Sequence, residues 1–329
     1  MRDVAQAAGV SLKTVSRVVN GEPGVGLATA ARVRQAIEAL GFHRNEIARS
    51  LRPGQASATV GLVIGDVSNP FYSAIARAVE GVARAHRHML ITASSEDEPD
   101  LERELVHTMS RHRVDGLLIV PAGRNGDDRY LEPELLMGTP VVFLDRPPEG
   151  VEADTILFDN VGGARLAVEH LLAYGHRRIG VVGDAPSFST VRERLEGYRL
   201  ALADEGLQFE DSLVRLSPHD AAEAESVAGA LLEQSDPPTA IFATNNRMSI
   251  GVLRAVRARG QRVALVGFDD FELADMLATP ITVVAHDPSE MGRVAAELLF
   301  ARLAGDAGPP KRLVLPTTLV VRGSGEIGP

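Results

Sequence analysis

The sequence of 329 residues contains no cysteine, no long apolar run and no overall excess of positive charge. Without cysteine there are no disulfides, thiolate metal sites or cysteine nucleophiles. The longest apolar runs, such as 60–65 and 116–120, are far shorter than the ~20 residues of a membrane helix. The first residues lack the basic-then-apolar pattern of a secretion signal. We therefore expect a soluble, intracellular protein of two or three domains.

Motifs of common enzyme classes are absent as well. The sequence has no G-x-x-x-x-G-K-[ST] loop, no G-x-S-x-G elbow and no H-E-x-x-H pair. The first strand-like run continues as G-D-V-S-N-P-F-Y, without the glycine fingerprint of a dinucleotide-binding enzyme. His86 and His88 are two residues apart, which we interpret as solvated surface rather than a metal site. We expect no enzyme, no cofactor and no metal.

The charge is distributed unevenly along the chain. The net charge is −10, but residues 1–54 carry eight basic and four acidic side chains and are therefore net positive. A small basic head on a large acidic body is expected when only one end of a protein meets DNA. Chance is an open alternative, because the positive excess in the head is modest.

Short helices are predicted in the head. The first has apolar residues at helical spacing and ends at Gly9, and the second, T-V-S-R-V-V-N, begins after Ser11 as its cap. The third runs from about 28 to 40 and ends at Gly41. A fourth could cover 45–51, and the small polar residues that follow predict a domain boundary.

From residue 59 onward, strand-like apolar runs alternate with amphipathic helices. Runs that are apolar on both faces favour parallel strands covered by helices, so the pattern predicts a doubly wound α/β fold in two similar lobes. The predicted strands are T-V-G-L-V-I-G-D, M-L-I-T-A-S, G-L-L-I-V-P, P-V-V-F-L-D, T-I-L-F-D, R-I-G-V-V-G-D, A-I-F-A-T-N, V-A-L-V-G-F-D and I-T-V-V-A-H.

Several of these strands end in a polar side chain. In open parallel sheets, ligands bind beyond the carboxyl ends of the strands, so two facing lobes would gather these groups around a cleft. The alternative is that each group only shapes a turn or caps the next helix. The five groups are Asp66, Asp145, Asp184, Asn245 and Asp269.

The stretch D-V-A-Q-A-A-G-V-S-L-K-T-V-S-R-V-V-N has the features of a helix-turn-helix. Small residues on its first helix allow the second to pack closely across it. Four side chains then lie on the outer face, available to a major groove: Leu12, Lys13, Ser16 and Arg17. Arg17 can reach a guanine edge, and the hydroxyls of Thr14 and Ser16 suit phosphates. An ordinary three-helix bundle is the alternative.

This stretch resembles the headpiece of the LacI/GalR family of bacterial transcriptional regulators. The resemblance continues, in the family's order, through A-I-E-A-L-G-F-H-R-N-E-I-A-R-S-L-R, I-G-D-V-S-N-P-F-Y, F-L-D-R, G-H-R-R-I-G-V-V-G, R-L-E-G-Y, V-G-F-D-D-F-E and L-V-V-R-G-S. It covers essentially the whole chain. It implies a small all-α helix-turn-helix headpiece followed by a two-lobed, periplasmic-binding-protein-like sensor domain of doubly wound parallel sheets.

The resemblance implies roles for residues of the head. It assigns base reading to Leu12, Lys13 and Arg17, and phosphate or helix-supporting contacts to Thr14, Ser16 and Asn20. The segment from Asn45 to Leu51 matches a hinge helix that orders when dimer and operator meet. Leu51 matches a leucine wedged into the minor groove, where an apolar side chain opens one base step and kinks the duplex. A buried hinge contact is the alternative for Leu51.

In the body, the resemblance implies an effector bound between the lobes. An aromatic wall beside an arginine, carboxylates and an amide suits a hydroxyl-rich, sugar-like ligand. Core packing of Phe71 and an ion pair of Arg194 with Asp145 or Asp269 are the alternatives. The implied effector residues are Phe71, Tyr72, Asp145, Arg194, Asn245, Asp269 and, at the border of the pocket, His286.

Some positions depart from the family pattern. Gly26 stands where a serine commonly caps the third helix, and Asn246 replaces an aspartate near the pocket. The chain starts at Met1-Arg2, so the few residues that usually precede the first helix are either absent or lost through a misassigned start, two alternatives that stay open. The last residues lack the leucine heptads of tetrameric relatives. We therefore expect a homodimer.

The boundaries that we predict are a headpiece over 1–44, a hinge and linker over 45–57, and a sensor domain over 58–329. Within the sensor domain, one lobe is expected to combine 58–158 with 287–316, and the other 159–286 with 317–329.

We expect a cytoplasmic, nucleoid-associated repressor that binds pseudo-palindromic double-stranded operator DNA, contacts no membrane and responds to a sugar or related polyol. A nucleoside or purine effector is open, because Tyr72 could stack on a base, and so is an activator role. An exported solute-binding protein is the remote alternative.

Overall fold

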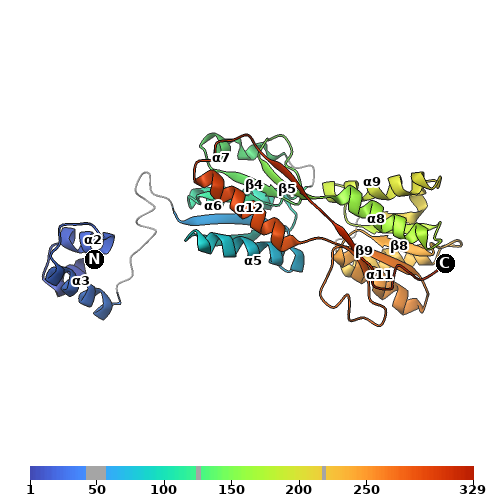
Figure 1. The fold of residues 1–329 in the computed structure, drawn as a ribbon, viewed down its shortest axis with the longest axis horizontal. Coiled ribbons are helices and arrows are strands. Elements are labelled where there is room, and N and C mark those ends of the chain that lie inside the picture. Colours follow the sequence, from blue (N-terminus) through green and yellow to red (C-terminus); the bar gives the residue numbers. More distant parts are fainter. Residues whose placement is uncertain (42–56, 124–126, 217–219) are drawn as a thin grey trace. The chain divides into compact units, whose positions relative to one another are not determined.

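The computed structural model describes residues 1–41, 57–123, 127–216 and 220–329 (Figure 1). Contacts within the chain define two compact units, Met1–Ser57 and Ala58–Pro329. Among the described residues, no helix has the length and apolar content needed to span a membrane.

Over residues 1–41, the first unit contains three helices, α1 (Arg2–Ala8), α2 (Leu12–Asn20) and α3 (Leu27–Ala39). Gly9 and Gly21 follow α1 and α2 in the left-handed region, with φ of +62° and +67°, which a residue without a Cβ adopts without strain. A small core of Val4, Val15 and Val33, one residue from each helix, holds the three together. The first three predicted head helices are confirmed, and the fourth, over 45–51, lies outside the described residues.

The second unit contains two six-stranded sheets. The first sheet is entirely parallel, in the order β11-β5-β4-β3-β1-β2, and the second is parallel except for β12, in the order β12-β10-β9-β8-β6-β7. The strands of the first are β1 (Thr59–Ile64), β2 (Met89–Ser94), β3 (Gly116–Ile119), β4 (Val141–Leu144), β5 (Asp154–Phe158) and β11 (Arg312–Leu315). Those of the second are β6 (Ile179–Gly183), β7 (Val214–Leu216), β8 (Ala240–Ala243), β9 (Ala264–Phe268), β10 (Thr282–Ala285) and β12 (Thr318–Val320).

Helices cover both faces of each sheet. Two separate buried clusters flank the first sheet, one built with α5 and α12 and the other with α6, and two more flank the second sheet, with α8 and α9 on one face and α10 and α11 on the other. The bounds are α5 (Pro70–Ala85), α6 (Pro99–Arg111), η1 (Asp128–Leu131), α7 (Glu132–Leu136), α8 (Asn160–Ala173), α9 (Ser189–Asp204), η2 (Asp211–Leu213), α10 (Ala221–Leu232), α11 (Asn246–Arg259) and α12 (Pro288–Leu303). The predicted doubly wound α/β fold is confirmed.

The chain passes from one sheet to the other three times, after β5, after β10 and after β11. We call the first sheet with its helices lobe 1 and the second sheet with its helices lobe 2. Figure 1 shows the two lobes joined by these crossing segments.

Every strand predicted from an apolar run is present, and the structure adds three strands that were not predicted. β7, β11 and β12 lie at sheet edges, and none of their residues is fully buried. These strands have only three or four residues, and an apolar segment that short does not by itself distinguish a strand from a loop.

Candidate functional site

The outer face of α2 carries the side chains predicted to meet DNA. Leu12 is 47% exposed and Lys13 is exposed, whereas Val15 on the opposite face is fully buried. Arg17 lies 3.9 Å from Glu22, and both side chains are about half exposed. Such a surface ion pair contributes roughly 0–1 kcal/mol, so Arg17 can exchange it for a base edge.

The hydroxyls of α2 are partly engaged in capping. Ser11 Oγ accepts a hydrogen bond from the Thr14 backbone N–H (3.1 Å) and lies 2.9 Å from Thr14 Oγ1. Thr14 therefore supports the start of the helix, and Ser16 is partly exposed one half-turn further on. Asn20 is the last residue of α2. Asn45 and Leu51 lie outside the described residues.

A cavity of about 60 Å³ lies between the carboxyl ends of the two sheets, and we call it the central cavity. Residues that follow β1 and β4 in lobe 1 and β6, β8 and β9 in lobe 2 line it. The lining includes all five strand-end groups, Asp66, Asp145, Asp184, Asn245 and Asp269, together with Phe71, Tyr72 and Arg194.

Three of the five strand-end groups also shape the backbone, as the alternative reading held. Asn245 caps α11 by accepting from the Met248 N–H (2.9 Å). Asp66 accepts from the Ser68 N–H (2.8 Å), and Asp184 accepts from the Ala185 N–H (2.7 Å). Capping and facing the cavity are compatible, because helix N-termini also point there.

In lobe 2, Arg194 and Asp269 form a buried charged pair. Arg194 Nη2 lies 3.5 Å from Asp269 Oδ1, and Arg194 also donates to Asn160 Oδ1 (2.9 Å) and the Thr244 carbonyl (2.5 Å). His286 Nε2 is 2.8 Å from Asp269 Oδ1. Burial opposes ionisation of Asp269, but Arg194 and His286 outweigh it and lower its pKa. The predicted ion pair of Arg194 is therefore present, within reach of the cavity.

His286 does not line the central cavity itself. Its side chain is buried behind Asp269, stacked on Phe158 (4.1 Å between ring centroids) and edge-on to Phe71 (5.5 Å). It therefore acts on the cavity through the position and charge of Asp269.

In lobe 1, Arg146 is the residue that the sequence reasoning missed. Its Nη1 donates to Asp97 Oδ1 (2.7 Å) and the Pro121 carbonyl (2.8 Å), and its Nη2 donates to the Tyr72 hydroxyl (3.1 Å). Its Nε lies 3.8 Å from Asp145 Oδ2. The signal was present, because Arg146 directly follows Asp145 in the F-L-D-R motif.

The two predicted aromatic residues differ in their roles. Phe71 is partly exposed at the start of α5, edge-on to Tyr72 (4.9 Å). Tyr72 is buried, and its hydroxyl is held by Arg146. Phe71 is thus the more accessible aromatic surface of the pair.

Contacts across the cleft hold the lobes together. Asn246 Nδ2 donates to Asn69 Oδ1 (3.0 Å), and Arg247 pairs with Asp66. The Arg146 guanidinium of lobe 1 stacks over the Phe188 ring of lobe 2 at 4.1 Å. With the lobes in this position the central cavity has room for about four or five waters.

The charges around the central cavity are largely compensated. Three arginines face five carboxylates, and each arginine already has a carboxylate within 4 Å: Arg146 with Asp97, Arg194 with Asp269 and Arg247 with Asp66. The arrangement offers many hydrogen-bond donors and acceptors without a positive excess, which suits a neutral, hydroxyl-rich ligand.

The histidine pair of the sequence lies away from this cavity. His86 stacks on Phe300 (4.1 Å), and His88 Nε2 is 3.2 Å from Asp115 Oδ2. Within the described ranges, no group of three or more histidine and carboxylate side chains is placed to hold a metal ion.

Two family models match the chain. Residues 1–45 match "Bacterial regulatory proteins, lacI family", and residues 168–325 match "Periplasmic binding protein-like domain". The HTH-type transcriptional regulator CelR of Thermobifida fusca is 36% identical, over 98% of this chain and 97% of CelR.

Solved structures show the same similarity. A complex of the transcriptional regulator CelR with cellobiose has a TM-score of 0.75 at 32% identity, and the lac repressor dimer bound to operator and the anti-inducer ONPF has a TM-score of 0.85 at 28% identity. Each comparison covers 98% of both chains.

Proposed function

Because the chain belongs to the LacI/GalR family of transcriptional regulators, we propose that it is a homodimeric repressor whose affinity for a pseudo-palindromic operator is controlled by a sugar. The relatives are transcriptional regulators and not enzymes, so the expectation that the chain is not an enzyme is confirmed. The observation that carries the sugar-responsive role is the gathering of five strand-end polar groups on one cavity. Binding to DNA places its action in the cytoplasm, at the nucleoid.

In the head, α2 enters the major groove, with Leu12, Lys13 and Arg17 against base edges. The exposure of this face supports the assignment. Thr14 and Ser16 fix the helix on the phosphates. The roles of Asn20, of the hinge segment from Asn45 to Leu51 and of Leu51 as a minor-groove wedge rest on the family resemblance alone, because the Asn20 side chain and residues 42–56 lie outside the described part of the chain.

Replacing Arg17 tests the base-reading role. Arg17→Ala should cost about 1–3 kcal/mol at one base pair and relax the choice of base there. The exposed Arg34→Ala on α3 is the matched control and should leave base preference unchanged. Binding to a library of single-base operator variants measures both, and an unchanged preference in Arg17→Ala would remove the assignment.

The effector lies against Phe71, Asp145, Arg194, Asn245 and Asp269, with Arg146 as an added contact and Tyr72 and His286 behind them. Compensated charges favour a neutral sugar over a sugar phosphate. A purine finds less support, because the Tyr72 hydroxyl is tied to Arg146 and the ring is buried.

The dimer follows from the two-fold symmetry of a pseudo-palindromic operator, in which each headpiece occupies one half-site. The lac repressor that the chain resembles is a dimer on its operator. Light scattering of the purified chain should give twice the mass of 35.1 kDa.

One experiment tests the whole proposal. DNA from upstream of the protein's own gene is titrated by fluorescence anisotropy against scrambled competitor, with and without neutral sugars, sugar phosphates and nucleosides. We expect preference for the upstream DNA and a change of roughly 5–150-fold in affinity with one neutral sugar. Equal binding to both DNAs under all conditions contradicts the regulator, and a response confined to nucleosides contradicts the sugar.

A further inference from the structure

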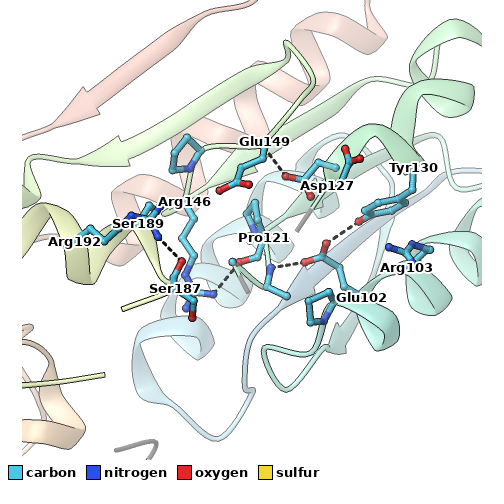
Figure 2. A pocket seen from close by; sticks show the side chains of 15 residues that line it. Glu102, Arg103, Pro121, Asp127, Tyr130, Arg146, Glu149, Ser187, Ser189 and Arg192 are labelled. Atoms are coloured by element: carbon cyan, nitrogen blue, oxygen red, sulfur yellow. Dashed lines mark hydrogen bonds between the residues drawn. The ribbon is translucent and has the colours of Figure 1, made fainter. Parts of the chain in front are cut away.

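A second cavity lies next to the central one, and we call it the side cavity (Figure 2). It measures about 40 Å³ and is lined from both lobes. Figure 2 shows Glu102 and Tyr130 on one side, from lobe 1, and Ser187, Ser189 and Arg192 on the other, from lobe 2.

The linings of the two cavities, as described, meet at Arg146. Arg146 lines both, and the Phe188 ring, which lines the central cavity, stacks under its guanidinium at 4.1 Å. Arg146 belongs to lobe 1 and Phe188 to lobe 2. Parting the lobes would open this stack and join the two cavities into one groove.

The side cavity has the mixed surface that sugar rings need. Pro99, Pro121 and Pro147 supply flat apolar surface, and Glu149 and Arg192 supply an acceptor and a donor at the exposed rim. Sugars present apolar ring faces and hydroxyl edges, which match such a combination.

Two buried polar atoms of the lining are left for a ligand. The Arg146 side chain is 92% buried, and neither its Nε nor Ser189 Oγ has a hydrogen-bond partner among the described residues. Buried polar atoms without partners are uncommon, and hydroxyl groups of a bound ligand would supply the missing partners.

Glu102 fixes the position of the lobe 1 wall of the side cavity. Its carboxyl accepts from the Ala122 N–H (2.6 Å) and the Tyr130 hydroxyl (2.8 Å), which fixes the segment after β3 and η1 around the cavity. The adjacent Pro121 carbonyl accepts from Arg146, so the two cavities share one rigid wall.

We propose that the side cavity is a second compartment of the effector site, which receives the second unit of a neutral oligosaccharide, while the first unit occupies the central cavity. This inference rests on the proposed sugar-responsive function. It makes the effector a disaccharide or a longer saccharide, with Glu149 and Arg192 as determinants of its length.

The test compares monosaccharides with their dimers on the full chain. Isothermal titration is run with glucose against cellobiose and maltose, galactose against lactose and melibiose, and xylose against xylobiose. We expect one dimer to bind at least about tenfold more tightly than its monosaccharide, the gain from one or two charge-assisted hydrogen bonds.

Variants of the exposed rim then locate the second unit. Glu149→Gln and Arg192→Ala should reduce the preference for the dimer to about threefold or less while leaving monosaccharide affinity unchanged. The controls Glu152→Gln and Arg111→Ala are equally exposed, line neither cavity and should change nothing.

The outcomes separate this inference from the function on which it rests. A monosaccharide that binds as tightly as its dimers, with both rim variants silent, overturns the second compartment and leaves the sugar-responsive repressor intact. Operator binding without a response to any saccharide of the panel overturns both the compartment and the sugar effector.

Discussion

The two lobes of the second unit each place a buried aspartate at the same point of the backbone, but the electrostatic surroundings of the two aspartates differ. In lobe 1, β4 ends in Asp145, and in lobe 2, β9 ends in Asp269; both residues are buried with positive φ, +63° and +67°. An aspartate tolerates this left-handed region better than most residues, and the sharp turn aims the carboxylate at the cavity. Equivalent positions in two similar folds therefore point at one ligand site.

The pKa values of Asp269 and Asp145 are shifted in opposite directions. Asp269 is held by His286 at 2.8 Å and Arg194 at 3.5 Å, and its pKa is lowered despite burial. Burial raises the pKa of Asp145, because Arg146 stays 3.8 Å away and forms its hydrogen bonds elsewhere. Lobe 2 thus presents a preformed anion, and Asp145 in lobe 1 has bonding capacity left for a ligand.

The largest expected effect comes from removing the cation of lobe 2. Arg194→Ala leaves Asp269 buried with one cation fewer and should lower the free energy of unfolding by about 3–5 kcal/mol. It should also abolish the effector response while the head still binds operator. Urea denaturation measures the first effect and anisotropy the second.

The matched control is Arg254→Ala, an exposed arginine on α11, which should change stability by less than about 0.5 kcal/mol. If Arg194→Ala lowered the free energy of unfolding no more than this control does, the ion pair of Arg194 with Asp269 would not preorganise lobe 2.

The next effect is a pH dependence confined to lobe 1. Burial raises the pKa of Glu102 from 4.5 to about 7, so the folded state holds its proton more tightly than the unfolded chain. This contribution is fully present below about pH 4.5 and is lost as pH rises through about 7, a change of about 3 kcal/mol. Glu102→Gln should lack this change, as denaturation at pH 5 and pH 8 will measure.

Glu104→Gln, an exposed residue of the same helix, should follow the unsubstituted protein at both pH values. If Glu102→Gln and Glu104→Gln showed the same change in stability between pH 5 and pH 8, Glu102 would not be the source of the pH dependence.

A smaller effect on stability distinguishes Asp269 of lobe 2 from Asp145 of lobe 1. At pH 7, Asp269→Asn should cost about 1.5–3 kcal/mol of stability, because it breaks charge-assisted bonds to His286 and Arg194. The cost should shrink as pH falls below about 3.9, where the unfolded carboxyl binds its proton before the folded one does. Asp145→Asn should be neutral or stabilising at pH 7, because burial already opposes its charge.

Thermal unfolding of the two variants between pH 3 and pH 7 compares them. If Asp269→Asn and Asp145→Asn lost the same stability at pH 7, the two aspartates would not differ in the charge that they carry in the folded protein.

The smallest effect concerns the contact between the lobes. The pair of Arg247 with Asp66 is one-third exposed, so Arg247→Ala should lower stability by no more than about 1 kcal/mol. Because opening the cleft between the lobes then requires less free energy, the affinity for the effector should rise by a few-fold. Titration calorimetry measures the affinity, with Arg254→Ala again as the control; a fall in affinity would instead make Arg247 a direct ligand contact.

Much of the fold followed from local patterns. Buried strands such as β1 and β9 are continuous apolar runs, and the head helices carry their caps and glycine stops in the sequence. The edge strands β7, β11 and β12 were missed, because three or four residues are too few for a periodic pattern to identify a strand.

The candidate site was predictable where a polar residue ends a strand, and less so elsewhere. Arg146 and Asp97 meet although they are 49 residues apart; the F-L-D-R motif marks Arg146, but no local pattern indicates that Asp97 is its partner. Phe188 stacks on Arg146 from the other lobe, which no local signal indicates. His286 was expected at the border of the pocket, whereas the structure buries it behind Asp269.

The sequence by itself determined the helical head, the alternation of strands and helices, and the polar groups at the strand ends, because these depend on spacing along one segment. Only the tertiary structure decided which arginine faces which aspartate, which of them stays ionised, and that a second cavity adjoins the first. Charge and burial depend on neighbours brought together across lobes, and their distances are set by packing that no single segment contains.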